Sequence, residues 1–244
     1  MVKHSGGEGN SVESLHAFKE YHSDDWCWDP CNKSSDVVLS TNHLAAYFHT
    51  DPVYESIGTA GVRGTKGFRE GEYYWEVIFT EPPLGTAVMV GVGTCEALLH
   101  TGNYQYVNLI GIDSHSWGIS HKGTIWHDGK YRNYCEAFFD QETRIGVQLN
   151  LYSGTLTFYK NGVNLGVAFT GLSGEDMDDI YPLACSTSAL TELELGIRTS
   201  RKLSLQEKCY SAILNRIGNS KRKVDQLPLP PLLKDILKGI AVYK

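Results

Sequence analysis

The stretch "RIGVQLNLYSGTLTFYKNGVNLGVAF", residues 144–169, predicts three successive strands joined by two tight turns. Its first part alternates apolar and polar side chains, as a half-buried strand does, with the apolar ones at Ile145, Val147, Leu149 and Leu151. After a turn at 152–154, "TLTFYK" forms the returning strand. Asn161-Gly162 favours a type I′ hairpin, because both central residues of that turn need a positive φ. The stretch therefore predicts consecutive antiparallel hairpins.

Similar short, strand-like segments lie on both sides of this stretch. They are "EYYWEVIF" (72–79), "TAVMVGVG" (86–93), "SWGISHKGTIWHDG" (116–129), "IYPLACSTSA" (180–189) and "ELELGI" (192–197). Many short strands with frequent turns, and without helices alternating between them, indicate two antiparallel sheets packed face to face. The predicted fold class is mainly β: a two-sheet sandwich over residues 23–200, followed by a small α-helical tail.

Composition and charge narrow the possible class of protein. The chain has 244 residues, of which 41% are hydrophobic, enough for one large domain and an appendage. A net charge of −6 argues against nucleic-acid binding, and no apolar run approaches the roughly 18 residues that span a bilayer. Residues 1–22 are polar and lack the apolar core of a signal peptide, so we expect a flexible segment there. The six cysteines show no disulfide framework, which predicts reduced thiols and a cytoplasmic or nuclear protein.

Residues 203–244 change from a strand-like to a helical period. Ser204 and Glu207 match a capping box, in which each side chain accepts a hydrogen bond from the backbone N–H of the other residue. Gly218 suits the left-handed residue that ends many helices. The sequence therefore predicts a helix over 205–217.

The remainder of the tail contains a charged run and a proline-rich run. Lys221-Arg222-Lys223 is interpreted as a solvated loop rather than as a nuclear-import or phosphate-binding patch. "LPLPP", residues 227–231, is expected to be extended, and Pro231 suits the first position of a last helix.

The predicted helix has more apolar surface than docking on a single core requires. At about 100° per residue, one apolar patch comprises Leu205, Cys209, Ala212 and Ile213. A second patch beside it comprises Tyr210, Leu214 and Ile217. We expect one patch to pack within this chain and the other to bind a different protein, since an uncovered patch would favour aggregation. The alternative is a helix whose contacts are wholly intramolecular.

Two motifs in the tail resemble a known family. "SLQEKCYSAI" (204–213) is similar to the element by which suppressor-of-cytokine-signalling (SOCS) boxes bind elongin B/C, and "LPLP" (227–230) is similar to the element by which they select cullin 5. Upstream, "VRGTKGF", "GEYYWEV", "VGVGT", "LIGIDSHSWGIS", "GTLTFYKNG" and "YPLACST" resemble a SPRY domain. The order and spacing resemble the SPRY domain-containing SOCS box proteins over nearly all of 23–240, most closely the divergent third type of that family.

The resemblance implies a substrate receptor of a ubiquitin ligase, without catalytic residues, metal or cofactor of its own. It divides the chain into a flexible segment at 1–22, a SPRY sandwich at 23–200 and a SOCS box at 203–244. Elongin C, with elongin B, would bind a set of anchors at Leu205, Cys209 and Ile213. Cullin 5 and its RING subunit would be selected through Leu227, Pro228, Leu229 and Pro230. Target proteins would then be ubiquitinated and degraded by the proteasome.

The resemblance also implies a pocket in the SPRY loops for a short, Asn-containing peptide of the target protein. Carried over motif by motif, its lining would be Thr50, Pro52, Val53, Tyr54, Gly93, Thr94, Tyr106, Leu109, Ile110, Gly111, Thr187, Ser188 and Ala189. This chain departs from the better-known members at Thr50 (Arg there), Tyr54 (Ala there) and Ser188 (Trp there). Loss of a bulky wall and of a charged donor predicts a different side-chain preference.

Other chemistry finds weaker support in the residues. Cys27 and Cys31, with His22 nearby, lack a second ligand pair for zinc, and the acidic turn 174–179 lacks the spacing of a calcium loop. His115, His121 and His127 are interpreted as ordinary surface histidines. A nucleophile elbow, a phosphate-binding glycine loop and a zincin helix are all missing from the sequence. Two alternatives to the ligase receptor stay open: a peptide-binding scaffold whose helical tail caps the sandwich, and a carbohydrate-binding or enzymatic sandwich.

Overall fold

The computed structural model describes residues 21–49, 57–83, 85–102, 104–139, 142–174, 177–189, 191–218 and 220–241. The chain divides into two compact units, Met1–Arg201 and Lys202–Lys244. The predicted flexible segment lies outside the described residues except at its end, where His22 already belongs to a strand.

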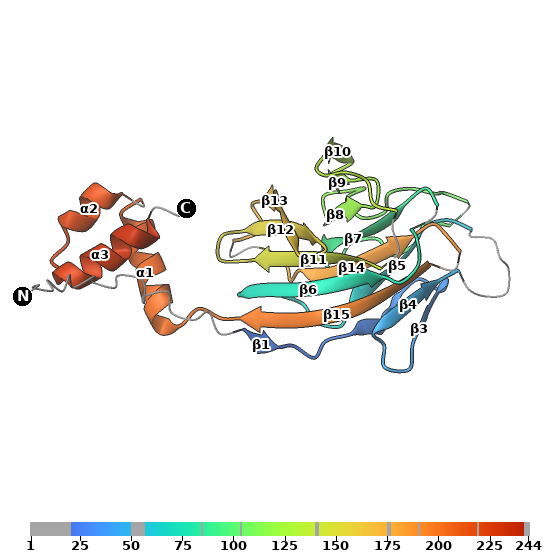
Figure 1. Cartoon of the computed structure of the whole chain (residues 1–244), viewed down its shortest axis with the longest axis horizontal. Helices are drawn as coiled ribbons and strands as arrows, with labels where there is room; N and C mark the ends of the chain where they lie inside the picture. The colour runs from blue at the N-terminus through green and yellow to red at the C-terminus, as the bar shows by residue number, and fades with distance from the viewer. Residues whose placement is uncertain are drawn as a thin grey trace, which may run out of the picture. The chain divides into compact units, whose positions relative to one another are not determined.

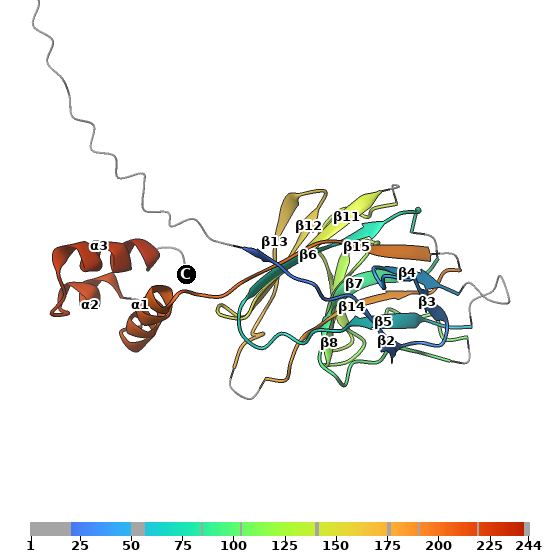
Figure 2. The same cartoon turned by 90° about the horizontal axis from the view of Figure 1, so that it is seen from below.

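The first unit contains two antiparallel sheets (Figures 1 and 2). In the first sheet the strand order is β13-β12-β11-β6-β15-β4-β3, and β1 also pairs with β15. The bounds of its strands are β1 (His22–Ser23), β3 (Val37–Leu39), β4 (Ala45–Phe48), β6 (Glu72–Phe79), β11 (Thr143–Asn150), β12 (Thr155–Lys160), β13 (Val163–Thr170) and β15 (Thr191–Arg201). This first sheet is called sheet A below.

The second sheet, called sheet B, has the strand order β10-β9-β8-β7-β14-β5-β2. The bounds of its strands are β2 (Trp28–Lys33), β5 (Ala60–Gly64), β7 (Val88–Gly93), β8 (Ser116–Ser120), β9 (Thr124–His127), β10 (Lys130–Asn133) and β14 (Tyr181–Ser186). Every named strand pair in both sheets is antiparallel. The predicted mainly-β sandwich with a helical tail is therefore confirmed.

The core lies between the two sheets and is rich in aromatic side chains. Strand β6 shows how the sequence fills it, because its alternate residues Tyr73, Trp75, Val77 and Phe79 are all buried. Trp26 contacts Trp75 edge to face, with ring centroids 5.8 Å apart, and Phe68 stacks on Tyr73 at 4.0 Å. Each such side chain contributes roughly 1.5–3 kcal/mol on burial. These packed rings hold the sheets together and leave the outward-facing residues of β6 for other contacts.

The stretch at 144–169 forms the predicted consecutive hairpins. Ile145 is opposite Lys160 and Leu149 is opposite Leu156 across β11 and β12. Asn161 and Gly162 have φ values of 49° and 80°, as a type I′ turn requires. This turn joins β12 to β13 and places Lys160 opposite Val163, whereas the pairing of β11 with β12 directs their apolar residues to the core.

The second unit consists of three helices: α1 (Leu205–Arg216), α2 (Lys221–Asp225) and α3 (Pro231–Ile240). The predicted capping box is present, since the N–H of Glu207 donates to the Ser204 hydroxyl (3.2 Å) and the N–H of Ser204 donates to the Glu207 carboxylate (2.9 Å). Gly218 is left-handed (φ 67°) and Pro231 occupies the start of α3, both as predicted. Among the described helices, none is long and apolar enough to cross a bilayer.

Two expectations for the helical unit were wrong. The run 221–223 is not a loop but the first turn of α2, which is held by the buried side chain of Val224. Tertiary packing here overrides a polar local sequence that contains one apolar anchor. The stretch 227–231 is also not fully extended, because the N–H of Leu229 donates to the carbonyl of Leu227 (2.8 Å) and bends the chain at Pro228.

A small core of its own stabilises the helical unit. Leu214 of α1, Val224 of α2 and Leu237 of α3 are buried against one another. Half-buried apolar residues surround them: Tyr210, Ile213, Ile217, Leu227, Leu229, Ile240 and Ala241. One side of α1 is therefore committed to contacts within this chain.

We expect Gly91→Ala to destabilise the sandwich by about 3 kcal/mol, the upper end of the usual cost of overpacking. A Cβ at Gly91 of β7 would lie 2.1 Å from the Trp117 carbonyl oxygen and 2.6 Å from the Gly118 Cα on the neighbouring strand β8. Gly102→Ala is the matched control, because its Cβ would meet its nearest neighbour at an ordinary 3.6 Å. Urea unfolding followed by tryptophan fluorescence measures both variants. Equal midpoints for the two would contradict the tight packing of β7 on β8.

Candidate functional site

The first candidate site is the outward face of helix α1. Leu205 is 79% exposed, and Cys209 and Ala212 are exposed as well. These three residues lie at positions i, i+4 and i+7 and therefore share one face of the helix. The predicted inner patch is found, since Leu214 on the other side of α1 is buried within this unit, and binding of the outer patch to another protein stays a prediction. The outward face is apolar surface that contributes nothing to the packing of the described helical unit.

Ile213 does not belong to the outward face of α1. It was expected on the outward patch, but its side chain is half-buried beside the Leu214 core. Its position is eight residues from Leu205, where the helix has turned by about 80° from the direction of Leu205. Ile213 therefore lies at the border between the inner and the outer face.

The predicted cullin-selecting segment connects α2 to α3 and alternates between buried and exposed side chains. Leu227 and Leu229 are half-buried against the Leu214 core, whereas Pro228 and Pro230 are exposed. The Lys234 ammonium of α3 donates to the Asp225 carbonyl at the end of α2 (2.8 Å), which closes the connection. The leucines thus anchor the segment, and the two proline rings face outward.

The second candidate site is one end of the sandwich, called the loop end below. The pairing of β14 with β7 and β5 places Ser186 opposite Val88 and Ala60, so Thr187 follows directly at this end. The Thr187 hydroxyl accepts hydrogen bonds from the N–H groups of Thr86 (3.1 Å) and Ala87 (3.0 Å). These bonds join the segment before β7 to the segment after β14.

Tyr106 lies at the same end. The segment around it is held by Thr59, whose N–H donates to the Gln105 carbonyl (3.1 Å) and whose hydroxyl donates to the Val107 carbonyl (2.9 Å). Thr59 directly precedes β5, and the Tyr106 side chain is 41% exposed. The structure therefore brings Tyr106 to the end of the sandwich where Thr187, Ser188 and Ala189 lie.

A buried histidine borders the loop end. His49 follows β4 and has a left-handed φ of 53°, and its Nε2 lies 3.2 Å from the carbonyl oxygen of Ser186. Burial lowers the pKa of His49, so the neutral ring is favoured near pH 7. A neutral imidazole that donates to Ser186 ties the end of β4 to the end of β14.

Three residues of the predicted pocket lie at the opposite end of the sandwich. Gly93 is paired with Tyr181, five residues along β14 from Ser186, and Thr94 follows it. Five residues of strand span about 17 Å, too far for one short-peptide pocket. Gly111 belongs with them, because its N–H donates to the Ser116 hydroxyl (2.8 Å), and Ser116 is paired with Gly93. The prediction that Gly93, Thr94 and Gly111 share a pocket with Thr187 is therefore wrong.

Two further members of the predicted pocket are buried rather than exposed to a ligand. Leu109 and Ile110 belong to a second apolar cluster together with Met89, Ala97, Leu183 and Cys185. They support the segment that carries Tyr106. Thr50, Pro52, Val53 and Tyr54 lie outside the described residues, and their role stays a prediction.

Thr86 and Gly85 lie at the loop end, although the motifs did not indicate them. A Cβ on Gly85 would lie 2.9 Å from the Ser188 Cβ, so the two segments touch. The available signal was strand direction: when two strands pair antiparallel, the segment before one meets the segment after the other. The motif "VGVGT" follows β7 and therefore belongs to the far end.

Metal binding has no support in the described part of the chain, where groups of three or more His, Cys, Asp or Glu side chains suited to a metal ion are not found. All six cysteines have free thiols, and Cys185 is fully buried. Burial raises the pKa of the Cys185 thiol to about 12, so it is a core residue and not a nucleophile.

Comparison with known proteins agrees with the fold. The family model described as "SPRY domain" matches residues 72–195, about half of the chain. The chain is similar to SPRY domain-containing SOCS box protein 3 of Xenopus laevis, with 37% identity over 235 residues that cover 93% of this chain and 63% of that protein. It is also similar to the Xenopus tropicalis protein of the same name, with 36% identity over 93% of this chain and 61% of that protein. The F-box/SPRY domain-containing protein 1 of Drosophila virilis is 35% identical over 69% of this chain and 65% of its own length.

Among solved structures, the PSpry domain of TRIM65 aligns with a TM-score of 0.55 and 21% identity, covering 71% of this chain and 90% of that chain. The SPRY domain of human HERC1 aligns with the same TM-score and 20% identity, covering 70% of this chain and 97% of that chain. At these identities the likeness concerns the fold alone. The chain spans less than two thirds of the length of the Xenopus relatives. An alignment that covers 93% of this chain nevertheless has to include α1 of the helical unit.

The two faces of α1 should respond differently to substitution. We expect Leu214→Ala to destabilise the helical unit by about 3 kcal/mol, because it leaves a cavity among α1, α2 and α3. Leu205→Ala should change its stability by less than about 0.5 kcal/mol, because an exposed side chain loses few contacts. Amide hydrogen exchange in α1 measures the effect, with faster exchange expected for Leu214→Ala alone. Equal acceleration in both variants would show that the outward face is already covered.

Proposed function

Because the chain belongs to the SPRY domain family and is similar to SPRY domain-containing SOCS box protein 3, we propose that it is a substrate-recognition subunit of a ubiquitin ligase. In this proposal the sandwich binds a target protein and the helical unit recruits elongin B/C, cullin 5 and the RING subunit. The observation that carries the proposal is the two-faced helix α1, whose inner face holds its own unit together while its outer face presents Leu205 and Cys209.

Helix α1 has the form of a helix that binds in a groove. Leu205 and Cys209 are one turn apart and would insert as neighbouring anchors into an apolar groove of elongin C. Ile213, at the border of the inner face, would contribute the edge of its side chain. Cys209 acts here as a small apolar side chain and not through its sulfur chemistry. The capping box at Ser204 supports this arrangement, because it fixes the start of α1 beside the first anchor.

The connection between α2 and α3 supports the cullin part of the proposal. Its leucines are turned into the helical unit and its prolines outward, so Pro228 and Pro230 present two rigid rings. Rigid proline surfaces lose little conformational entropy when they bind. This edge would contact cullin 5 after elongin C has bound α1.

The loop end of the sandwich is proposed to hold the target peptide. Thr86, Tyr106, Ser188 and Ala189 all lie at this end, which offers backbone amides and hydroxyls. Such groups suit a short Asn-containing peptide, because a carboxamide needs both donors and acceptors. The absence of a Trp at Ser188 leaves room for a larger neighbouring side chain of the peptide than better-known family members would accept.

In this function the chain performs no bond chemistry. It would hold a lysine of the target protein near the ubiquitin carried by the ligase, and thereby raise the effective concentration of one reactant at the other. Targets marked in this way would be degraded by the proteasome. The competing hypothesis is a peptide-binding scaffold that has no ligase partner.

Elongin binding separates these two hypotheses. We expect the wild-type chain to co-purify with elongin B/C as a stoichiometric complex, and Leu205→Ala/Cys209→Ala to abolish that complex. Truncation of two buried anchors in such a groove costs roughly 2 kcal/mol or more for each. Leu232→Ala is the matched control, since Leu232 is a 64% exposed leucine of the same unit on α3. Circular dichroism confirms that all variants are folded. If the wild-type chain does not bind elongin B/C, the ligase proposal is wrong and the scaffold hypothesis is favoured.

Peptide binding locates the pocket. With a panel of short Asn-containing peptides, each paired with its Asp-substituted form, we expect Tyr106→Ala to weaken the best binder by about tenfold. Thr94→Val removes a hydroxyl at the opposite end of β7 and should leave the affinity unchanged. Isothermal titration calorimetry on the full chain measures both. Loss of binding in Thr94→Val but not in Tyr106→Ala would place the pocket at the other end of the sandwich.

A further inference from the structure

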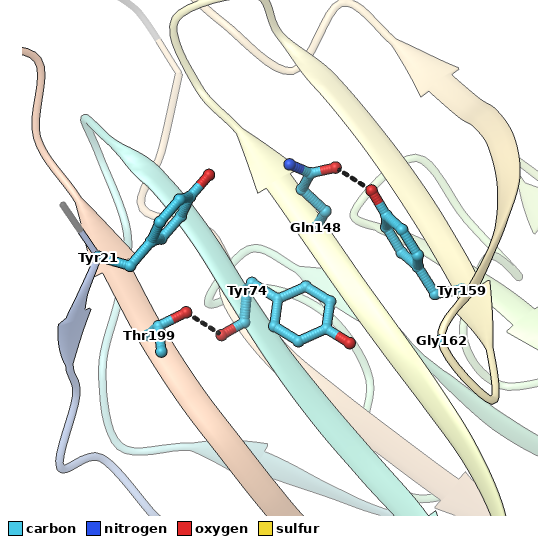
Figure 3. Close-up of a pocket in the computed structure, with 6 residues that line it drawn as sticks. All are labelled: Tyr21, Tyr74, Gln148, Tyr159, Gly162 and Thr199. Atoms are coloured by element: carbon cyan, nitrogen blue, oxygen red, sulfur yellow. Dashed lines mark hydrogen bonds between the residues drawn. The ribbon is translucent and has the colours of Figure 1, made fainter. Parts of the chain in front are cut away.

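A hollow of about 330 Å³ opens on the outer face of sheet A, and neither proposed binding site uses it. It is lined by Tyr21, Tyr74, Gln148, Tyr159, Gly162 and Thr199 (Figure 3). Tyr74 and Thr199 are paired near the start of β6, whereas Phe79 at the other end of β6 is close to the loop end. The hollow is therefore separated from the loop end by about 17 Å of strand. It is called the tyrosine hollow below.

Two tyrosine rings form perpendicular walls of the hollow. The rings of Tyr74 and Tyr159 have centroids 5.7 Å apart and an interplanar angle of 87°. Tyr74 reaches across strand β11 because residue 146 is glycine: a Cβ there would lie 2.5 Å from the Tyr74 hydroxyl oxygen. The corner formed by the Tyr74 and Tyr159 rings thus depends on Gly146 of the neighbouring strand β11.

A chain of hydrogen bonds crosses five adjacent strands of sheet A and holds these walls. Its members, from β13 to β15, are Asn164, Tyr159, Gln148, Glu72 and Arg201. The side-chain amide of Asn164 donates to the Tyr159 hydroxyl (3.1 Å). That hydroxyl donates to the side-chain oxygen Oε1 of Gln148 (2.8 Å). The Gln148 amide donates to Glu72 (3.0 Å), and Glu72 pairs with Arg201 (3.3 Å). Both charged groups are buried, so the Tyr159 side chain is positioned by a network that is costly to disrupt.

Carboxylates exceed cations on this face of the sheet. Strand register and burial turn four glutamates outward from β6 and β15, namely Glu72, Glu76, Glu192 and Glu194. The outward arginines are Arg144 of β11, which pairs with Glu76 (3.5 Å), and Arg201 of β15, which pairs with Glu72 (3.3 Å). The Tyr74 hydroxyl donates to Glu76 (3.0 Å), and Arg144 approaches the other oxygen of Glu76 only at 3.5 Å. The Glu76 carboxylate therefore lies at the hydroxyl edge of the Tyr74 ring, with Arg144 beside its second oxygen.

The phenols of the hollow stay neutral over the physiological range. Burial and the neighbouring Glu72 carboxylate raise the pKa of Tyr21 to about 12. Burial and Glu76 raise the pKa of Tyr74. Neutral phenol rings keep the electron-rich faces that attract cations, and they bring no negative charge of their own.

We propose that the tyrosine hollow binds an arginine side chain from a protein segment that is distinct from the peptide held at the loop end. A guanidinium is planar, so it can lie against the face of Tyr74 while its N–H fork reaches Glu76. An ammonium would meet the same charge but would stack less well on the ring. A neutral or apolar ligand would cover Glu76 without replacing its hydration. The combination of ring corner and carboxylate therefore selects a basic partner segment.

An arginine peptide and its neutral analogue test this proposal on the full chain. The probe is acetyl-Gly-Arg-Gly-amide, and citrulline and lysine replace arginine in two matched peptides. NMR signals of tyrosine ring carbons report binding and its location. We expect the shifts to centre on Tyr74 and Tyr159, with the citrulline peptide binding at least about tenfold more weakly and the lysine peptide in between.

Variants decide whether the hollow itself carries the binding. Glu76→Gln keeps the shape of the site and should weaken the arginine peptide about fivefold or more, and Tyr74→Ala should do the same. Glu96→Gln, an exposed carboxylate away from sheet A, is the control for charge. Tyr131→Ala is the control for aromatic surface, since Tyr131 is 65% exposed and stacks on Trp126 without a place in the hollow. Both controls should keep the wild-type affinity.

The proposal would be overturned if citrulline and arginine peptides bound equally, or if Glu76→Gln had no effect in a folded protein. It would also be overturned if either control lost as much affinity as the hollow variants. Loss of elongin binding in Leu205→Ala/Cys209→Ala leaves this result untouched, because the tested residues belong to the sandwich unit.

Discussion

Antiparallel strand pairing is the constraint on which the sandwich and its binding end depend. When every strand runs against its neighbour, the connections divide into two groups at opposite ends of the sheets. Ser186 of β14 is opposite Val88 of β7, so the segment after β14 meets the segment before β7. The Thr187 hydroxyl then joins them through the N–H groups of Thr86 and Ala87. A motif is therefore assigned to an end by strand direction and not by its distance along the chain.

The helical unit depends on a different constraint, the width of a helix stripe. A helix that contributes to one small core needs about 100° of apolar surface. Helix α1 supplies this with Tyr210, Leu214 and Ile217, and then carries further apolar side chains on its other face. Because a unit with so small a core has little stability to spare, apolar residues that add no packing point to a second contact. In the proposed function, that second contact is the binding of α1 to elongin C.

Local patterns in the sequence predicted the local structure well. The hairpin at Asn161-Gly162 and the capping box at Ser204 each depend on backbone geometry within a few residues, and both were found as predicted. Helix α2 was missed because its polar run contains one apolar residue, Val224, whose partners come from α1 and α3. Thr94 was placed at the wrong end because pairing between distant strands decides the end. Errors thus arise where the deciding contacts are long-range.

The tyrosine hollow is another feature that local sequence patterns could not predict. Asn164, Tyr159, Gln148, Glu72 and Arg201 are spread over about 130 residues of sequence, and only the strand order of sheet A brings them into one line. A buried ion pair such as Glu72–Arg201 is weak evidence for added stability, because the cost of removing two charges from water offsets much of their attraction. Apolar residues on a sheet face would stabilise it at lower cost. A network that is expensive to bury and that positions Gln148 and Tyr159 is more simply explained by what it holds in place. The feature that it holds is the Tyr159 wall of the tyrosine hollow, against which the Tyr74 ring packs edge to face.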